Sequence, residues 1–165
     1  MTIPIWVKLM IWTWIPALEL RASIPVAILH YDLHWAHAFG VCVLANALLA
    51  IPVWGFTHFG AAQMRRLAWF ERLWERIVER ARTKLSPLVD RWGFLGVALF
   101  IAVPLPGSGV YTGLVGAYVL GVDTKRAMLA AVVGVILAGS AVTAASVSGG
   151  EAWQWLLNTS LLGGE

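Results

Sequence analysis

The chain has 165 residues, of which 59% are hydrophobic and only 13% are charged. A soluble domain carries roughly 25% charged residues, so this composition excludes an ordinary soluble protein and favours an integral membrane protein. The net charge of +3 comes from residues 62–91, which hold eight basic and four acidic residues, while the rest of the chain sums to −1. One basic segment does not form the basic face that nucleic acids need, so no nucleic-acid partner is expected.

The first apolar stretch, residues 3–29, is long enough for a membrane span of about 20 residues. It is interrupted at mid-length by Pro16-Ala-Leu-Glu-Leu-Arg-Ala-Ser-Ile-Pro25. Proline removes a backbone donor, and within hydrocarbon a broken backbone persists only where protein or a wet cavity surrounds it. The pattern predicts a helical hairpin that enters and leaves the membrane on the same side.

This break carries two opposite charges, Glu19 and Arg21. An ionisable residue within a membrane segment is costly and by default marks a functional site. Glu19 could exchange a proton, and the planar fork of Arg21 could bind an anion such as a phosphate or pair with Glu19. The alternative is an ion pair that only closes the hairpin. We assign Glu19, Arg21, Ser23 and Pro25 to a predicted path for substrate and protons.

A polar loop follows, in which His30, Asp32, His34 and His37 fall within eight residues. Three imidazoles and a carboxylate are possible metal ligands, but a zinc site needs these side chains to converge. A metal site and a pH-sensing loop therefore stay open as weaker alternatives to an interfacial loop. No cofactor is expected.

Residues 37–59 form an uninterrupted apolar stretch and predict a spanning helix. Asn46 is the isolated polar residue within it. Such a residue can hydrogen-bond a neighbouring helix or contact a substrate, and both readings stay open. We include Asn46 in the predicted path.

Residues 62–85 predict an amphipathic helix, because apolar residues such as Phe70, Trp74 and Ile77 recur at helical spacing. Ser86-Pro87 is expected to end it. The basic segment that contains this helix should lie on the cytoplasmic side, where its basic face would meet anionic lipid headgroups. A helix that binds a protein partner is the alternative.

The third apolar stretch, residues 92–120, is broken by proline and glycine between Pro104 and Gly109. The helix that starts after such a break directs a positive dipole end at an anion, although the break could also serve packing alone. Ser108 lies between glycines, but without a histidine near it in the sequence a hydrolase nucleophile is a weak alternative. The residues assigned here to the predicted path are Pro104, Pro106, Gly107, Ser108, Gly109, Tyr111 and Thr112.

Residues 125–147 predict a second spanning helix, and residues 151–165 an interfacial tail. A broken stretch followed by a span therefore occurs twice, at 3–59 and 92–147, as in many transporters. With residues 62–91 cytoplasmic, the charge rule favours two inverted repeats with both termini outside; four full spans are the alternative. The predicted fold is an all-α membrane protein in one domain, with two inverted repeats, each a re-entrant helical hairpin plus a transmembrane helix, joined by a cytoplasmic amphipathic helix.

Two segments resemble the signature segments of the small multidrug export protein family, which is distantly similar to the DedA/VTT membrane proteins. They are Glu19-Leu-Arg-Ala-Ser-Ile-Pro-Val-Ala-Ile and Pro104-Leu-Pro-Gly-Ser-Gly-Val-Tyr-Thr-Gly. The resemblance implies drug export or, through the DedA relatives, proton-dependent handling of lipids such as undecaprenyl phosphate by two re-entrant hairpins. It also implies that Glu19 and Arg21 match essential residues of the first hairpin. The uncharged stretch from Pro104 to Thr112 departs from DedA proteins, which place arginines there.

The function predicted from the sequence is a membrane transporter rather than an enzyme, proton-coupled, for an amphipathic or lipid-like substrate. An anionic lipid carrier such as a polyprenyl phosphate ranks above cationic drugs, because Glu19 has Arg21 beside it. A non-transporting scaffold or assembly factor is the alternative. The predicted partners are membrane lipids, protons and a second copy of the chain. The predicted location is a prokaryotic inner membrane.

Overall fold

The computed structural model describes residues 4–149 except 17, 61–63, 65–67 and 104–107. The described residues are helical, with short connections and no strand among them. The predicted tail at 151–165 lies outside them. The elements are α1 (Ile5–Thr13), α2 (Glu19–Pro25), η1 (Val26–His30), α3 (Trp35–Gly55), η2 (Phe56–Gly60), α5 (Ala68–Trp92), α6 (Phe94–Ala102), α7 (Val110–Val119) and α8 (Thr124–Val147), where η marks a wide π-helical turn.

Two helices are long and apolar enough to cross a membrane: α3 with η2, which together cover 26 residues, and α8, which covers 24. At about 1.5 Å per residue they reach roughly 35–40 Å, more than the hydrocarbon core of about 30 Å. A polar side chain caps the N-terminus of each of these two helices. The side chain of Asp123 accepts a hydrogen bond from the Lys125 N–H at 3.0 Å, and His34 accepts one from the Ala36 N–H at 3.3 Å. The two span predictions are confirmed by length and composition.

Large apolar side chains lie exposed along these helices. Leu44 and Ile51 of α3 are 56% and 60% exposed, and Leu129 of α8 is 53% exposed. Contiguous apolar surface of this kind is unusual on a soluble monomer. It is the surface that a helix bundle presents to lipid.

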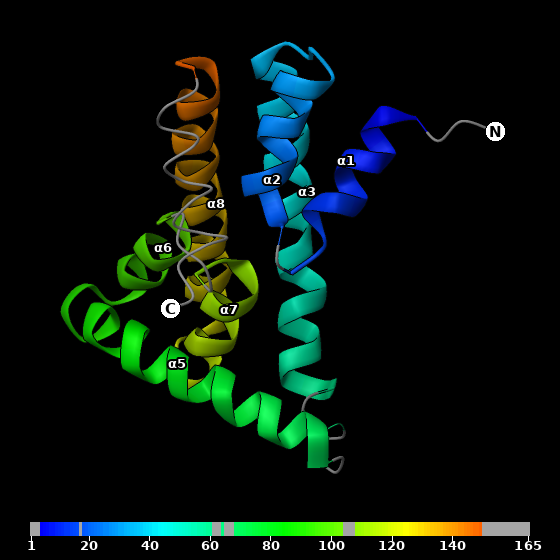
Figure 1. Cartoon of the computed structure of the whole chain (residues 1–165). Coiled ribbons are helices and arrows are strands. Elements are labelled where there is room, and N and C mark those ends of the chain that lie inside the picture. Colours follow the sequence, from blue (N-terminus) through cyan, green and yellow to red (C-terminus); the bar gives the residue numbers. More distant parts are fainter. Residues whose placement is uncertain (1–3, 17, 61–63, 65–67, 104–107, 150–165) are drawn as a thin grey trace, which may run out of the picture.

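Helix α8 forms the centre of the bundle and packs against α2, α3, α6 and α7. Its buried face consists mainly of small residues, which allow close approach. A side chain at Gly134 would meet the Ala98 carbonyl of α6, and one at Gly139 would meet Val43 of α3. The main apolar core therefore forms where α6 and α3 reach α8 from two sides (Figure 1).

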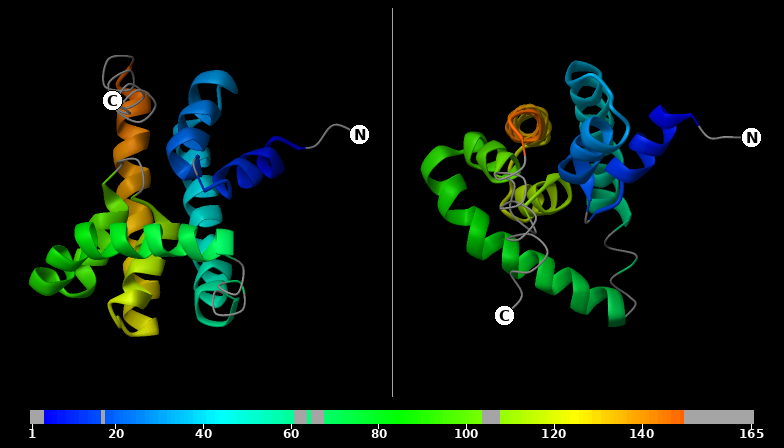
Figure 2. Two further views of the ribbon diagram at one scale, coloured as in Figure 1. Left: turned by 60° about the horizontal axis from the view of Figure 1, so that its bottom comes forward. Right: turned by 45° about the horizontal axis from the view of Figure 1, so that its top comes forward.

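The helices on either side of each break contact each other. In Figure 1, α1 and α2 meet at the first break, and α2 then runs beside α3 in the opposite chain direction. Helices α6 and α7 pack against each other on either side of the second break. The long helices α3 and α8 contact each other and run in opposite directions. Helix α5 crosses the bundle rather than running along it (Figure 2) and packs on α6 and α7.

The first break is shorter than predicted. The sequence favoured an interruption from Pro16 to Pro25, but α2 already begins at Glu19 and includes Pro25 as its last residue. Pro25 lacks an N–H, and the helix continues past it as the wide turn η1, closed by a 3.2 Å hydrogen bond from the Tyr31 N–H to the Val26 carbonyl. Widened turns of this kind are a common way for a helix to pass an irregular position.

The predicted end of the amphipathic helix at Pro87 is wrong, because α5 runs on to Trp92 with Pro87 inside it. An interior proline removes one helical hydrogen bond. Leu85 is fully buried, and Leu88 and Val89 pack against the same core. Burial of these side chains holds the last turns in helical form despite the proline. The predicted start at residue 62 lies outside the described residues.

Candidate functional site

Glu19 begins α2, and its backbone has a φ of +43°, a left-handed conformation that is rare outside glycine. For a residue with a Cβ this conformation costs roughly 1–2 kcal/mol. Such strain persists only where surrounding contacts hold it, and it is frequent at functional sites. The side chain is also buried, with 6% of its surface exposed. The fold therefore holds a strained backbone and a buried carboxyl group at one position.

The Glu19 carboxylate lies at the N-terminus of α7, in the other half of the chain. The Val110 N–H donates a long hydrogen bond of 3.4 Å to Glu19 Oε2. A Cβ at Gly109 would lie 2.6 Å from both carboxylate oxygens, so only glycine leaves room for them. The sequence predicted that this helix end would receive an anion. In the structure the group that lies there is the protein's own Glu19.

Arg21 contacts the two residues that flank positions 104–107 in the second break. Its Nη2 atom donates to Ser108 Oγ at 3.1 Å and to the Val103 carbonyl at 3.4 Å. Ser108 Oγ in turn donates to the Val103 carbonyl at 2.6 Å. The two charges of the first break therefore contact both sides of the second break. We call this set of five residues (Glu19, Arg21, Ser108, Gly109 and Val110) the break contact.

Asn46 of α3 adds an amide to this region. It is 1% exposed and approaches the Glu19 carboxylate. Neither its side-chain oxygen nor its nitrogen makes a regular hydrogen bond with a described residue. A buried amide without partners costs on the order of 1–3 kcal/mol, which is rarely tolerated without a reason. The approach of Asn46 on α3 to Glu19 on α2 is consistent with bonding to a neighbouring helix, and contact with a bound group also stays open.

Tyr111 joins the two breaks a second time. Its hydroxyl donates to the Trp14 carbonyl at 2.5 Å, and the Trp14 indole donates to the Ala45 carbonyl of α3 at 3.0 Å. Thr112 stays within the first turn of α7, where its hydroxyl accepts from the Gly109 N–H at 3.1 Å. Trp14 was missed from the sequence because it is one of ten tryptophans and nothing in the pattern distinguishes it.

Ser23 and Pro25 are not brought to the break contact. Ser23 Oγ lies 2.7 Å from Thr13 Oγ1 and donates to the Glu19 carbonyl at 2.6 Å, so it joins α1 to α2. Pro25 is buried within α2. Three further residues assigned to the path, Pro104, Pro106 and Gly107, lie outside the described residues.

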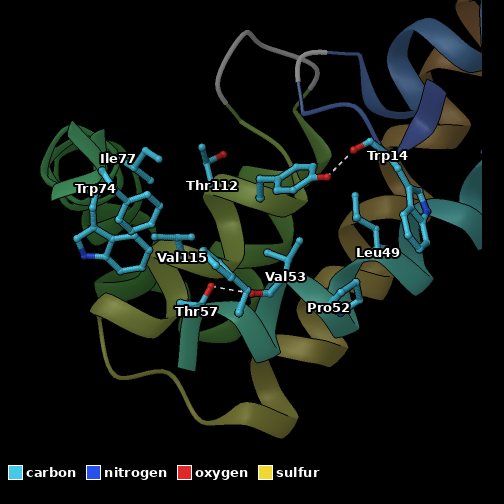
Figure 3. A pocket seen from close by; sticks show the side chains of 12 residues that line it. Trp14, Leu49, Pro52, Val53, Thr57, Trp74, Ile77, Thr112 and Val115 are labelled. Atoms are coloured by element: carbon cyan, nitrogen blue, oxygen red, sulfur yellow. Dashed lines mark hydrogen bonds between the residues drawn. The ribbon is translucent and has the colours of Figure 1, made fainter. Parts of the chain in front are cut away.

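An apolar pocket of about 410 Å³ lies between α3, α5 and α7, beside the break contact (Figure 3). In the figure, Trp74 and Ile77 of α5 form one side, and Trp14, Leu49 and Pro52 form the other. Its described lining residues include no charged side chain. The lining residues are Trp14, Leu49, Pro52, Val53, Phe56, Thr57, Phe70, Trp74, Ile77, Tyr111, Thr112 and Val115.

Residues 19–140 match the family described as Putative small multi-drug export protein. The chain belongs to this family. The matched range begins at Glu19 and includes α2, α3, α7 and both sides of the break contact. No curated protein and no solved structure matches the chain.

Membership in this export family and the two apolar helices together indicate a membrane protein. A transporter or exporter is consistent with the family's description, which does not denote an enzyme class.

The histidine side chains of the loop lie against aromatic rings. Its rings contact one another and nearby aromatic rings: His34 lies 5.9 Å from His37, His37 lies 6.4 Å from Trp6, and His30 lies 4.9 Å from Tyr31. Among the described residues, no group of three His, Cys, Asp or Glu side chains is placed to hold a metal ion. Asp32 has a φ of +49°, so it turns the chain between η1 and α3.

Proposed function

We propose that this member of the export family is a proton-coupled transporter with two inverted repeats, in which α1 with α2 and α6 with α7 are re-entrant hairpins. Helix lengths support this arrangement: α1 and α6 have nine residues each and α7 has ten. At about 1.5 Å per residue each reaches roughly 15 Å, half of the hydrocarbon core. The opposite directions of α3 and α8 also fit inverted repeats.

The observation that carries the transport proposal is the buried Glu19 carboxylate at the N-terminus of α7. The ionised carboxylate is attracted by the Val110 N–H and the positive end of the helix. Protonation removes its charge and most of this attraction. One proton would therefore change the contact between the two breaks, which is what coupling between proton and substrate requires.

Charge balance favours an anionic head on the substrate. Glu19 and Arg21 together carry no net charge while the carboxylate is ionised, and protonation of Glu19 gives the pair a net charge of +1. The α7 N-terminus, released by Glu19, and the Arg21 guanidinium would then both favour an anion such as a phosphate. A polyprenyl phosphate lipid carrier fits this description. Cationic drugs are the second candidate, favoured by the aromatic lining of the pocket.

Intramembrane hydrolysis has no support at Ser108. Its hydroxyl donates to the Val103 carbonyl and accepts from Arg21. A serine nucleophile needs a base within hydrogen-bond reach, and no described histidine is bonded to it. A scaffold without transport activity stays an alternative that the following experiment addresses.

The test is substrate-driven proton flux in proteoliposomes that contain a pH-sensitive dye, with a polyprenyl phosphate or ethidium as substrate. We expect Glu19→Gln to reduce the flux to the level of empty liposomes, because glutamine keeps the shape of the side chain but has no group that ionises in this pH range. Glu75→Gln, which changes an exposed acid on α5, should leave it unchanged. Two outcomes would favour the scaffold. One is unchanged flux in Glu19→Gln, and the other is no flux with either substrate together with a lower stability of Glu19→Gln. Flux with ethidium alone would favour drug export.

A further inference from the structure

The pocket between α3, α5 and α7 has a hydrocarbon-like interior. Besides apolar side chains it has three lining hydroxyls, and each is engaged by the protein itself. Thr57 donates to the Val53 carbonyl at 2.7 Å, Tyr111 donates to the Trp14 carbonyl, and Thr112 accepts from the Gly109 N–H. Since none of the described lining residues is charged, they offer a ligand mainly apolar contact. Its volume of about 410 Å³ lies within the roughly 300–1,000 Å³ of small-molecule sites.

Part of the pocket wall consists of α7 residues that directly follow the break contact in the chain. Tyr111 and Thr112 line the pocket and are the second and third residues of α7, directly after Val110, whose N–H donates to Glu19. Trp14, from the first break, also lines the pocket. The apolar space therefore begins one residue from the groups that would hold an anionic head.

The other sides suggest how a chain could enter. Helix α5 contributes Phe70, Trp74 and Ile77 from its apolar face, which packs on Val115 without filling the space. In η2, which continues the apolar helix α3, the lining residue Phe56 is 45% exposed. A hydrocarbon chain could thus pass from the bilayer into the pocket without crossing water.

From this arrangement we propose that the pocket is the tail subsite of the transporter: it holds the hydrocarbon chain of an amphipathic substrate whose head lies at the break contact. The inference rests on the proposed function for the position of the head. A flat organic cation fits less well, because the pocket has no acidic side chain among its described lining residues and the Glu19 carboxylate lies at the α7 N-terminus.

The experiment uses the full chain in phosphatidylcholine nanodiscs and two photoreactive probes with the same tail. Dodecyl phosphate and dodecyltrimethylammonium each carry a diazirine at the end of the tail, and labelled residues are identified by mass spectrometry. We expect the phosphate probe to label α3, α5 and α7 at the pocket, and unlabelled dodecyl phosphate to compete. Val115→Phe fills the pocket and should reduce this labelling about tenfold. The same substitution on the exposed face of α8, Val132→Phe, should change it less than twofold.

A second pair of variants guards against misfolding of Val115→Phe. Trp74 lines the pocket, whereas Trp69 on the same helix is 61% exposed and does not. Trp74→Ala should weaken probe labelling several-fold, and Trp69→Ala should not. Labelling confined to exposed α8 residues such as Leu129, equal labelling in all variants, or no competition by dodecyl phosphate would overturn the tail subsite, since an ordinary bilayer chain would then account for it.

The two probes separate this inference from the proposed function. If both label the pocket equally and Val115→Phe suppresses both, the tail subsite stands and the anionic head assignment fails. The opposite outcome is proton flux driven by the polyprenyl phosphate in proteoliposomes, with labelling and flux unchanged in Val115→Phe and Trp74→Ala. In that case the proposed function stands and the tail subsite fails.

Discussion

The two breaks of this protein perform complementary tasks with different chemistry. The first supplies charges, Glu19 and Arg21, on a backbone that is strained at Glu19. The described part of the second supplies no charge, but a backbone N–H at Val110, a hydroxyl at Ser108 and the bare Cα of Gly109. The charges of one break thus find their partners in the other. In this pair, the break without charged side chains contributes its electrostatics through its backbone.

The difference also explains why the two halves look so unlike in sequence. If each break carried its own charges, like groups would meet where the breaks touch, and they would repel. This repulsion is avoided because the Glu19 carboxylate faces a backbone donor, while the Arg21 guanidinium faces the acceptor oxygens of Ser108 and Val103. The groups that the two breaks bring to the contact are therefore complementary rather than alike.

Accessibility labelling tests whether the two breaks enter from opposite sides. Single cysteines replace Asp32, Arg72 and Asp123, which are all exposed, in a Cys42→Ala background. In right-side-out vesicles we expect a membrane-impermeant thiol reagent to label position 32 alone, with 72 and 123 labelled only after lysis. This all-or-none pattern follows from two re-entrant hairpins. Labelling of both 32 and 123 from outside would mean four full spans and would end the inverted-repeat proposal.

Replacing Gly109 tests whether the uncharged break positions the charge. The Cβ of Gly109→Ala would lie 2.6 Å from both Glu19 oxygens, so the carboxylate must leave the α7 N-terminus. We expect proton flux to fall about tenfold or more, and stability to fall by roughly 1–3 kcal/mol. Gly40→Ala is the control, because a Cβ there meets nothing within 4 Å. Helix propensity should make that variant more stable by about 0.5–1 kcal/mol.

A Gly109→Ala protein with normal flux would show that the contact between Glu19 and α7 is not needed for transport. Thermal unfolding of both variants in the same detergent separates a local change from general loss of structure.

The sequence was sufficient for features that depend on composition along one segment. Apolar length identified α3 and α8, helical periodicity identified α5, and the cost of charge in apolar sequence identified Glu19 and Arg21. It was not sufficient for Pro25, which local rules placed in the first break, or for Pro87, which they read as a helix end, although buried neighbours keep both in helices. The predicted second copy of the chain and the lipid partners stay predictions.

Features built by several segments were beyond sequence reasoning. Asn46 faces Glu19, and Gly109 leaves room for the same carboxylate, but a single-sequence pattern does not say which helix faces which. The pocket needs α3, α5 and α7 to meet, and its residues look like ordinary core or lipid-facing side chains when each helix is read alone. Helical periodicity predicts a face but not its neighbour.

The smallest predicted effect concerns the strain at the first break. Glu19→Ala and Glu19→Gly remove the same carboxylate, so they differ in whether a Cβ must adopt the left-handed backbone at φ +43° and in the greater freedom of glycine in the unfolded chain. We expect the glycine variant to be more stable by about 1 kcal/mol. At Arg21, which lies inside α2, the order should reverse, because alanine favours a helix over glycine by about 1 kcal/mol. Unfolding in detergent gives both differences, and equal stability of the two Glu19 variants would show that the strain is absent. If the order holds while both variants lose proton flux, the strained backbone serves only to position the carboxylate, and the chemistry at this contact belongs to the side chain.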